Sequence, residues 1–392
     1  MSRQSRLKKT KEIKHLIILY ILSGALIFAN SGCSSDKDTI PEPALEMTYD
    51  GNSTDLKHTV ILPTLNTPIP KGKNVIWCSS FQLAWNELKI NVIGEPVKVI
   101  GAEDIANRLN LARQSRADIS DKSCYATAGI VKDGILEKIQ TEMAKRFPSE
   151  QQPDFSDVLP IDVIIAYSYL MANVKFRIPY FENNKEFIFR DSQGNETPVT
   201  SFGIRPEDDY AYKKLRKQVE ILYYSHHQDS YKLMEFAVDL CKDTKPNQIV
   251  LAVIEPKDTL EQTLAYLDDK IVGFTKDDFF HQFGINDVLL VPNIFWRITH
   301  HLKELEGKYL ANKGFEDLYI RLALQMIQFR LDRSGAELKS EAKVYAAPIP
   351  NIFVFDRPFL IYMKKRGAEF PFFVMWIDNA ELLSKPSTPV QD

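Results

Sequence analysis

The amino-acid sequence predicts an α+β fold built from large mixed or antiparallel sheets with flanking helices. Runs of β-branched and aromatic residues, bounded by Pro, Gly, Asn and Asp, recur through residues 163–363. Apolar residues at helical spacing occur in separate blocks and do not alternate strictly with those runs. No repeat or linker divides the body, which indicates one domain over residues 58–385 and a short tail over 386–392.

The first 32 residues have the pattern of a signal peptide. Six basic side chains lie between Arg3 and Lys14, and an apolar run of 13 residues follows from Leu16 to Phe28. As a helix this run would extend ~20 Å, which is too short for a hydrocarbon core of about 30 Å. We therefore expect residues 1–32 to be removed on export.

The residues around Cys33 predict a lipid anchor. Asn30, Ser31 and Gly32 precede the cysteine, and this arrangement resembles a lipobox, although Asn30 replaces the usual aliphatic residue. An ordinary signal peptide that ends at Cys33 is the alternative. The acidic segment 34–38 resembles the surface-export tag of Bacteroidetes lipoproteins, and residues 33–57 have the composition of a disordered tether. The expected location is the cell envelope, on an outer-membrane-anchored lipoprotein that faces outside.

Charge and cysteine content limit the possible partners. Residues 1–32 carry six basic side chains and one acidic, so their removal shifts the net charge from −3 to −8. This balance argues against a nucleic-acid partner. Cys78, Cys124 and Cys241 are widely spaced and include no CxxC pair, so they predict buried free thiols and no zinc site.

The periodicity predicts individual elements in the following order. Helices are expected over 81–88, where Ser79 and Ser80 can cap the start, over 130–147 and over 299–310. Strands are expected over 163–174, 185–189, 219–224, 249–254 and 359–363.

Catalytic motifs are absent from the sequence. It contains no GxSxG, HExxH, Walker or dinucleotide-binding pattern, so we expect no catalytic residue, no metal, no cofactor and no enzymatic activity. Adjacent histidines at 226–227 and 300–301 point in different directions on a strand or a helix and cannot easily chelate one ion. We expect a surface turn for the first pair and a helix face for the second. The acidic pairs at 208–209, 268–269 and 277–278 are expected to be solvated.

The C-terminal third carries the most specific pattern. Residues 355–363 read FDRPFLIYM, a polar turn follows over 364–369, and a second apolar run covers 370–377. Apolar runs on both sides of the turn predict a hairpin buried on both faces, with Phe359, Ile361, Phe372, Val374 and Trp376 in the core. This hairpin resembles the closing motif of the serpins. Residues 291–298 and 172–180 are similar to serpin strands in the same order, and the resemblance extends over roughly residues 70–383.

Two features depart from the serpin pattern. The segment 73–80 lacks the proline of the corresponding serpin helix start. The helix that crosses the main sheet in serpins should fall between Phe147 and Leu159, where the sequence is too short and too rich in proline to form it.

The resemblance implies a reactive loop between Gly335 and Asn351. In serpins this loop is a bait that a peptidase cuts and that then inserts into the main sheet. Small or apolar residues alternate with charged ones from Ala336 to Val344, as a half-buried strand requires, although a strand already resident in the sheet would show the same alternation. The implied hinge and core-facing residues are Gly335, Ala336, Leu338, Ser340 and Ala342, and the implied bait residues are Lys343, Tyr345, Ala346 and Ala347.

Loop length and hinge composition leave two functions open. The segment is roughly six residues shorter than in typical inhibitory serpins, which removes about 20 Å of reach. Arg333 replaces an acidic residue, and Leu338 and Lys339 interrupt the usual alanines. The resemblance implies a peptidase inhibitor or peptidase-binding protein with serine or cysteine peptidases as partners. The alternative is a non-inhibitory binding protein with the same fold.

Overall fold

The computed structural model describes residues 45–157, 161–173, 175–205, 213–226, 233–242, 244–334 and 350–387. The main sheet contains a central parallel pair of strands. β16 runs parallel to β5 and antiparallel to β14, β5 runs antiparallel to β4, and β1 joins the outer edge parallel to β14. The strands in sheet order are β1 (Tyr49–Asn52), β14 (Ile294–His301), β16 (Tyr319–Leu331), β5 (Ile164–Asn173) and β4 (Cys124–Ile130), and β15 (Lys308–Tyr309) pairs with β16.

A second sheet contains the predicted closing hairpin. β18 and β19 pair antiparallel at its centre, and Phe359, Ile361, Phe372, Val374 and Trp376 are all buried, which confirms the predicted core positions. The strands in sheet order are β10 (Glu220–His226), β11 (Leu233–Asp239), β12 (Asn247–Val253), β18 (Phe359–Lys365), β19 (Phe373–Ile377), β3 (Asn74–Cys78) and β2 (Thr59–Ile61).

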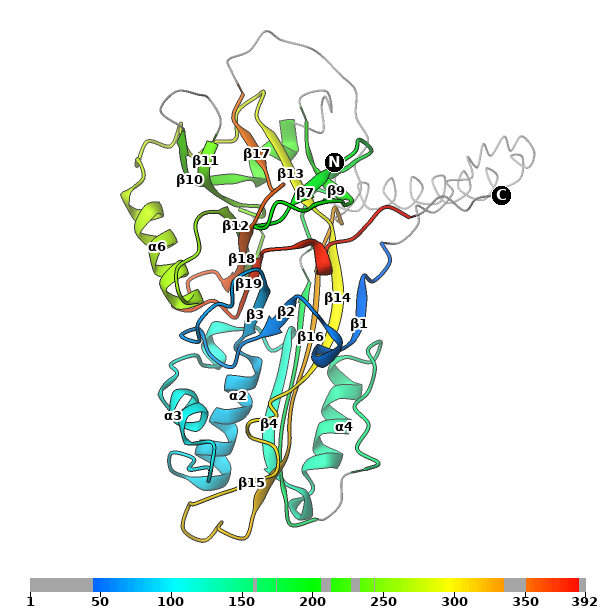
Figure 1. Ribbon diagram of the computed structural model, residues 1–392, viewed down its shortest axis with the longest axis vertical. Helices are drawn as coiled ribbons and strands as arrows, with labels where there is room; N and C mark the ends of the chain where they lie inside the picture. The colour runs from blue at the N-terminus through cyan, green and yellow to red at the C-terminus, as the bar shows by residue number, and fades with distance from the viewer. Residues whose placement is uncertain are drawn as a thin grey trace, which may run out of the picture. The chain divides into compact units, whose positions relative to one another are not determined.

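A third, smaller sheet lies close to the end of the second sheet labelled β10 and β11 (Figure 1). It contains β17 (Ile352–Val354), β13 (Val288–Pro292), β9 (Ser201–Ile204) and β6 (Phe181–Asn183). A separate hairpin is formed by β7 (Ile188–Arg190) and β8 (Glu196–Pro198).

Helices lie on both faces of the main sheet and on one face of the second sheet. α2 (Ser80–Glu87) continues into a π-helical segment, η2 (Leu88–Ile93), and lies with α3 (Glu103–Leu111) on one face of the main sheet, whereas α4 (Ile135–Arg146) lies on the opposite face (Figure 1). α6 (Leu260–Gly273) covers the second sheet. The 3-10 turns among the described residues are η1 (Ser53–Asp55), η3 (Arg116–Asp118), η4 (Val131–Asp133), η6 (Arg216–Gln218) and η7 (Ala380–Leu382).

Three clusters of buried residues correspond to these layers. The largest joins α2, one face of the main sheet and one face of the second sheet, where Phe329 of β16 stacks on Phe373 of β19 with ring centroids 4.7 Å apart. The second lies between the second sheet and α6. The third lies between the main sheet and α4. The fold is therefore α+β with mixed sheets and flanking helices, as the sequence predicts.

The structure corrects the predicted helix over 299–310. β14 continues to His301, which pairs with Leu324, and a turn with a hydrogen bond from the Leu305 N–H to the Leu302 carbonyl then leads to β15. Leu302 and Leu305 are buried, so their spacing reflects a packed turn and not a helix. Pairing with the long neighbouring strand β16 outweighs the local apolar spacing in this segment.

The structure also corrects one predicted boundary and adds two helices. The expected tether over 33–57 extends too far, because Tyr49–Asn52 forms β1 and pairs with β14. The helices α3 and α6 were not predicted, although Thr259 caps α6 by accepting a hydrogen bond from the Gln262 N–H at 3.2 Å.

Candidate functional site

The candidate site is the end of the main sheet where β16 leads into the predicted loop. β16 ends at Leu331, the description continues to Ser334, and it resumes at Pro350 just before β17. The predicted hinge and bait residues lie outside the described residues: Gly335, Ala336, Leu338, Ser340, Ala342, Lys343, Tyr345, Ala346 and Ala347. Cys33 also lies outside them. The structure therefore describes the two ends of the loop and the sheet beside it.

The first end of the loop is fixed by a buried carboxylate. Asp332 is 4% exposed, and its oxygens accept hydrogen bonds from Nε of Arg330 at 2.6 Å and from the Ser334 N–H at 2.9 Å. The serpin resemblance places an acidic residue at the position of Arg333. Arg333 instead donates from Nε to the Tyr180 carbonyl at 3.1 Å. Asp332, one residue before Arg333, was not singled out from the sequence. An acidic residue this close to the expected position is the signal that could have identified it.

The backbone at this end is also fixed. The carbonyl of Ser334 accepts a hydrogen bond from the Phe176 N–H at 3.1 Å, and the carbonyl of Arg333 accepts one from the Tyr180 N–H at 3.0 Å. Residues 333 and 334 are therefore held against the chain that follows β5. Any movement of the loop into the sheet has to begin after Ser334 or break these bonds.

The second end of the loop is held by Asp287. One oxygen of this carboxylate accepts a hydrogen bond from the Asn351 N–H at 2.8 Å, and the other accepts one from the Gly284 N–H at 2.7 Å. Burial raises the pKa of the Asp287 carboxyl, against the lowering effect of these hydrogen bonds. The chain then enters β17, which pairs in parallel with β13 from Val288↔Ile352 onward.

The sheet beside the loop contains a directly paired β5 and β16. Their register extends from Ile164↔Ile320 to Asn173↔Arg330. The chain that leaves β16 at Leu331 would run antiparallel to both strands if it entered between them. Such an insertion would replace one parallel interface with two antiparallel ones, and antiparallel pairing is slightly more stable per residue.

Small and polar side chains line part of the seam between β5 and β16 on its α2 side, next to the apolar pair Leu170 and Ile327. Ala166 is paired with Ala323, and Ser168 with Gln325. Gln325 donates from Nε2 to Sγ of Cys78 and to Oγ of Ser80, both at 3.1 Å. The hydroxyl of Ser168 is buried and has no hydrogen-bond partner among the described residues. A buried hydroxyl without a partner is costly to the folded state.

The start of α2 differs from its expected cap. Ser79 occupies the N-cap position but makes no side-chain capping hydrogen bond. Ser80 is the first residue of the helix, and its hydroxyl lies 3.2 Å from Sγ of Cys78 and accepts from Gln325. The two serines therefore contribute differently from the prediction, and Ser80 links β3 to the seam.

The opposite face of the seam is covered by α4. Ile139 and Met143 of α4, with Phe147 just beyond it, are buried against Tyr169 of β5 and Met326 of β16. By the serpin resemblance, the helix that covers the main sheet would fall between Phe147 and Leu159. The sequence there is too short and too rich in proline to form it. The structure shows that α4, which the sequence predicts as an ordinary helix over 130–147, provides this cover.

The other candidate residues from the sequence do not form a reactive centre. His300 and His301 lie on β14, not on a helix, and bond to different partners: Nδ1 of His300 lies 2.8 Å from Oγ of Ser53, and Nδ1 of His301 lies 2.8 Å from Oε1 of Glu306. The second residue of the pair at 226–227 lies outside the described residues. Across the described ranges, no group of three or more His, Cys, Asp or Glu side chains could hold a metal ion.

The cysteines and acidic pairs noted in the sequence have the following positions in the structure. Cys78, Cys124 and Cys241 are free and buried, as predicted, and burial raises the pKa of Cys78 and of Cys241 to about 12. The acidic pair 268–269 lies on α6, the pair 277–278 lies in the following turn, and the pair 208–209 lies outside the described residues. In the part of the chain that the structure describes, no helix is both long enough and apolar enough to cross a membrane.

Comparisons with known proteins identify the fold. No protein-family model and no curated protein matches the sequence. The crystal structure of native protease nexin-1 with heparin is similar, with a TM-score of 0.50, 12% identity, and coverage of 78% of this chain and 93% of that chain. The structure of Manduca sexta serine protease inhibitor (serpin)-12 has a TM-score of 0.48, 13% identity and coverage of 78% and 92%. Uncleaved ovalbumin has a TM-score of 0.48, 12% identity and coverage of 78% and 93%.

Identities near 12% show similarity of fold alone. The match to protease nexin-1 extends over most of both chains, and the closing hairpin and strand order agree with the resemblance found in the sequence. The chain therefore has a serpin-like fold.

Proposed function

We propose that this chain is a non-catalytic, peptidase-binding lipoprotein of the cell envelope, and that its segment 335–349 is the bait for a serine or cysteine peptidase. The observation that carries the proposal is the direct parallel pairing of β5 with β16, next to the point where the chain leaves β16. A cut in the segment would free its first half to enter this seam. The fold alone does not distinguish an inhibitor from a binding protein.

The register of β16 decides how far such an insertion could proceed. A four-residue connection over 332–335 would place Ala336 opposite Leu331 and Ala342 opposite Gln325, on the α2 side of the sheet. The intervening Leu338 and Ser340 would face the same side, where Leu331, Phe329 and Ile327 belong to the main core. In this register the predicted core-facing residues therefore lie on the same face of the sheet as the core residues of β16.

The charged alternates would face α4. In the same register Glu337 would lie opposite Arg330, which is only partly buried. Glu341 and Lys343 would lie opposite Met326 and Leu324, which are 6% and 8% exposed under the α4 cover. Burying an unpaired charge there is costly. We therefore expect insertion to begin and then stop after about Ser340 unless α4 moves.

If insertion is incomplete, we expect the peptidase to cut the bait and be released, not to be trapped. In a trap, rapid and complete insertion must precede hydrolysis of the covalent intermediate. The apolar contacts of α4 with the sheet oppose that step. This same observation favours the second candidate function, a binding protein that retains the fold without inhibition.

The position of the tether supports a target close to the membrane. β1 enters the sheet beside the start of β14, where the Thr48 N–H donates to the Phe295 carbonyl at 2.7 Å. Ile294, at the start of β14, is paired with Leu331 at the end of β16. The described chain therefore begins at the same end of the main sheet as the loop. A lipid on Cys33 would hold that end within about 40 Å of the membrane, since some twelve residues separate Cys33 from Leu45.

A panel of serine and cysteine peptidases tests the proposal. We expect cleavage between Val344 and Pro350 without a lasting covalent complex on a denaturing gel. A stable covalent complex would establish a full inhibitor. Absence of cleavage in this segment by every peptidase would exclude it as an exposed bait.

A further inference from the structure

A cavity of about 610 Å³ lies beside the second end of the loop, between β10, η6 and the turn that precedes β13. This volume is within the range of sites that bind small organic molecules. We propose that the cavity binds an organic anion with an apolar body, of the medium-chain carboxylate class. The inference is independent of the proposed bait function, because it rests on the walls of this cavity.

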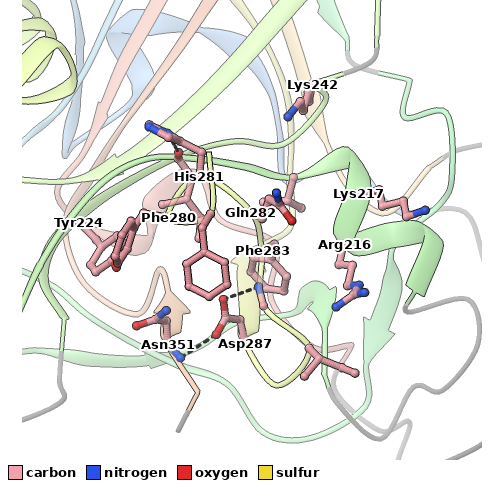
Figure 2. A pocket seen from close by; sticks show the side chains of 15 residues that line it. Arg216, Lys217, Tyr224, Lys242, Phe280, His281, Gln282, Phe283, Asp287 and Asn351 are labelled. Carbon is pink, nitrogen blue, oxygen red and sulfur yellow. Dashed lines mark hydrogen bonds between the residues drawn. The ribbon is translucent and has the colours of Figure 1, made fainter. Parts of the chain in front are cut away.

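The inner wall of the cavity is apolar. Val219, Ile221 and Phe283 line it and are 2%, 1% and 3% exposed. Phe280 lies nearer the solvent, with 42% of its surface exposed. Figure 2 shows Tyr224, Phe280 and Phe283 together on one side of the cavity. An alkyl chain or an aromatic ring could therefore be removed from water against this wall.

Two cations, Arg216 and Lys217, lie beyond Phe283 in Figure 2. A third, Lys242, lines the cavity apart from them. Lys242 forms an ion pair with Glu220 at 3.7 Å. The remaining two cations are adjacent in sequence on η6, and a carboxylate near them would gain a favourable interaction in a partly desolvated site.

Among the described residues that line the cavity, the one acid is Asp287, and its carboxylate is already hydrogen-bonded. Both oxygens of Asp287 already accept backbone hydrogen bonds, from Gly284 and from Asn351. Burial raises the pKa of this carboxyl, against the lowering effect of these hydrogen bonds and of Arg216. Because Glu220 pairs with Lys242, Arg216 and Lys217 remain against Asp287, and this positive excess in the described lining favours an anion.

The wall is held in place by backbone contacts. The ring nitrogens of His281 lie 2.7 Å from the Ile221 carbonyl oxygen and 2.6 Å from the Thr275 carbonyl oxygen. The Ile221 N–H also donates to the His281 carbonyl at 3.0 Å. These contacts attach the turn to β10, so the cavity exists before a ligand binds.

Calorimetric titration of the full chain carrying Cys33→Ser tests the inference, with decanoate and uncharged decan-1-ol as probes. We expect saturable one-to-one binding of decanoate, at least tenfold tighter than decanol. Octanoate should bind more weakly than decanoate by about fourfold for each missing methylene. The double variant Arg216→Gln/Lys217→Gln should weaken decanoate binding about tenfold and leave decanol binding unchanged.

A charge-matched control is available on α4. Lys138 and Lys145 are exposed there, so Lys138→Gln/Lys145→Gln should leave both affinities unchanged. Thermal melts of both double variants should match the parent, which separates lost binding from lost folding. The inference is overturned if decanoate does not saturate, if decanol binds equally well, or if the η6 and α4 variants have the same effect.

Discussion

Replacing Phe359 by alanine should destabilise the body strongly, because this side chain lies at the centre of an aromatic cluster. Phe359 is 0% exposed, and its ring centroid lies 5.2 Å from that of Phe355 and 6.3 Å from that of Phe189. Phe355 in turn contacts Phe236 at 5.0 Å, so the cluster joins the closing hairpin to β11. The substitution removes a large buried side chain and leaves a cavity, which costs about 3–5 kcal/mol.

The expected shift in melting temperature follows from the size of the body. A body of roughly 340 residues has an unfolding entropy near 0.7 kcal/mol/K, so a loss of about 4 kcal/mol lowers the midpoint by about 6 °C. Phe279→Ala is the matched control, since that side chain is 74% exposed and should shift the midpoint by less than about 1 °C. Circular dichroism melts of the two variants measure the difference. Equal midpoints for Phe359→Ala and Phe279→Ala would refute the role assigned to the hairpin core.

Three further predictions concern the anchor, the loop and acid stability. Cys33→Ser should release the protein from membranes, and continued fractionation with the envelope together with labelling by a palmitate analogue would contradict the lipid anchor. Asp332→Ala should lower the free energy of unfolding by about 1–3 kcal/mol in a denaturant melt, because it leaves the buried donors of Arg330 and Ser334 without an acceptor. It should also speed cleavage after Ser334. Asp162→Ala, which removes an exposed ion pair, should have neither effect. Burial, together with the charge of His301, lowers the pKa of His300 to about 4. Since this value lies below the unfolded one of about 6.5, the stability linked to neutral His300 is complete above pH ~6.5 and is lost as the pH falls towards 4, so His300→Gln should flatten the melting profile in that window.

The closing hairpin could be predicted from the sequence because its signals are local. Apolar runs on both sides of a polar turn require two buried faces, and the register Phe359↔Ile377 through Met363↔Phe373 satisfies both. The strand over 163–174 was predicted for the same reason and appears as β5. Long buried strands carry their signal in composition, so their partners need not be known.

The segment 299–310 could not be assigned correctly because its structure depends on a distant strand. Leu302 and Leu305 are spaced as in a helix, yet the carbonyl and N–H groups up to His301 pair with β16. The role of Asp332 was hidden for a related reason. Its partners are local, but its burial is created by the fold around the end of β16. The spacing of apolar residues along the chain reveals neither the pairing with β16 nor the burial of Asp332.

The central claim is that the chain after Ser334 can enter the seam between β5 and β16 once it is cut. Limited proteolysis between Val344 and Pro350, followed by a thermal melt, measures this on the parent and on a variant with Met171→Cys and Gln328→Cys. These two positions are paired across the part of the seam that residues 336–340 would enter, so an oxidised cross-link should hold it closed. The account predicts that cleavage raises the midpoint modestly in the parent and not in the cross-linked variant. An unchanged or lower midpoint in the cut parent, or an equal rise in the cross-linked protein, would contradict it.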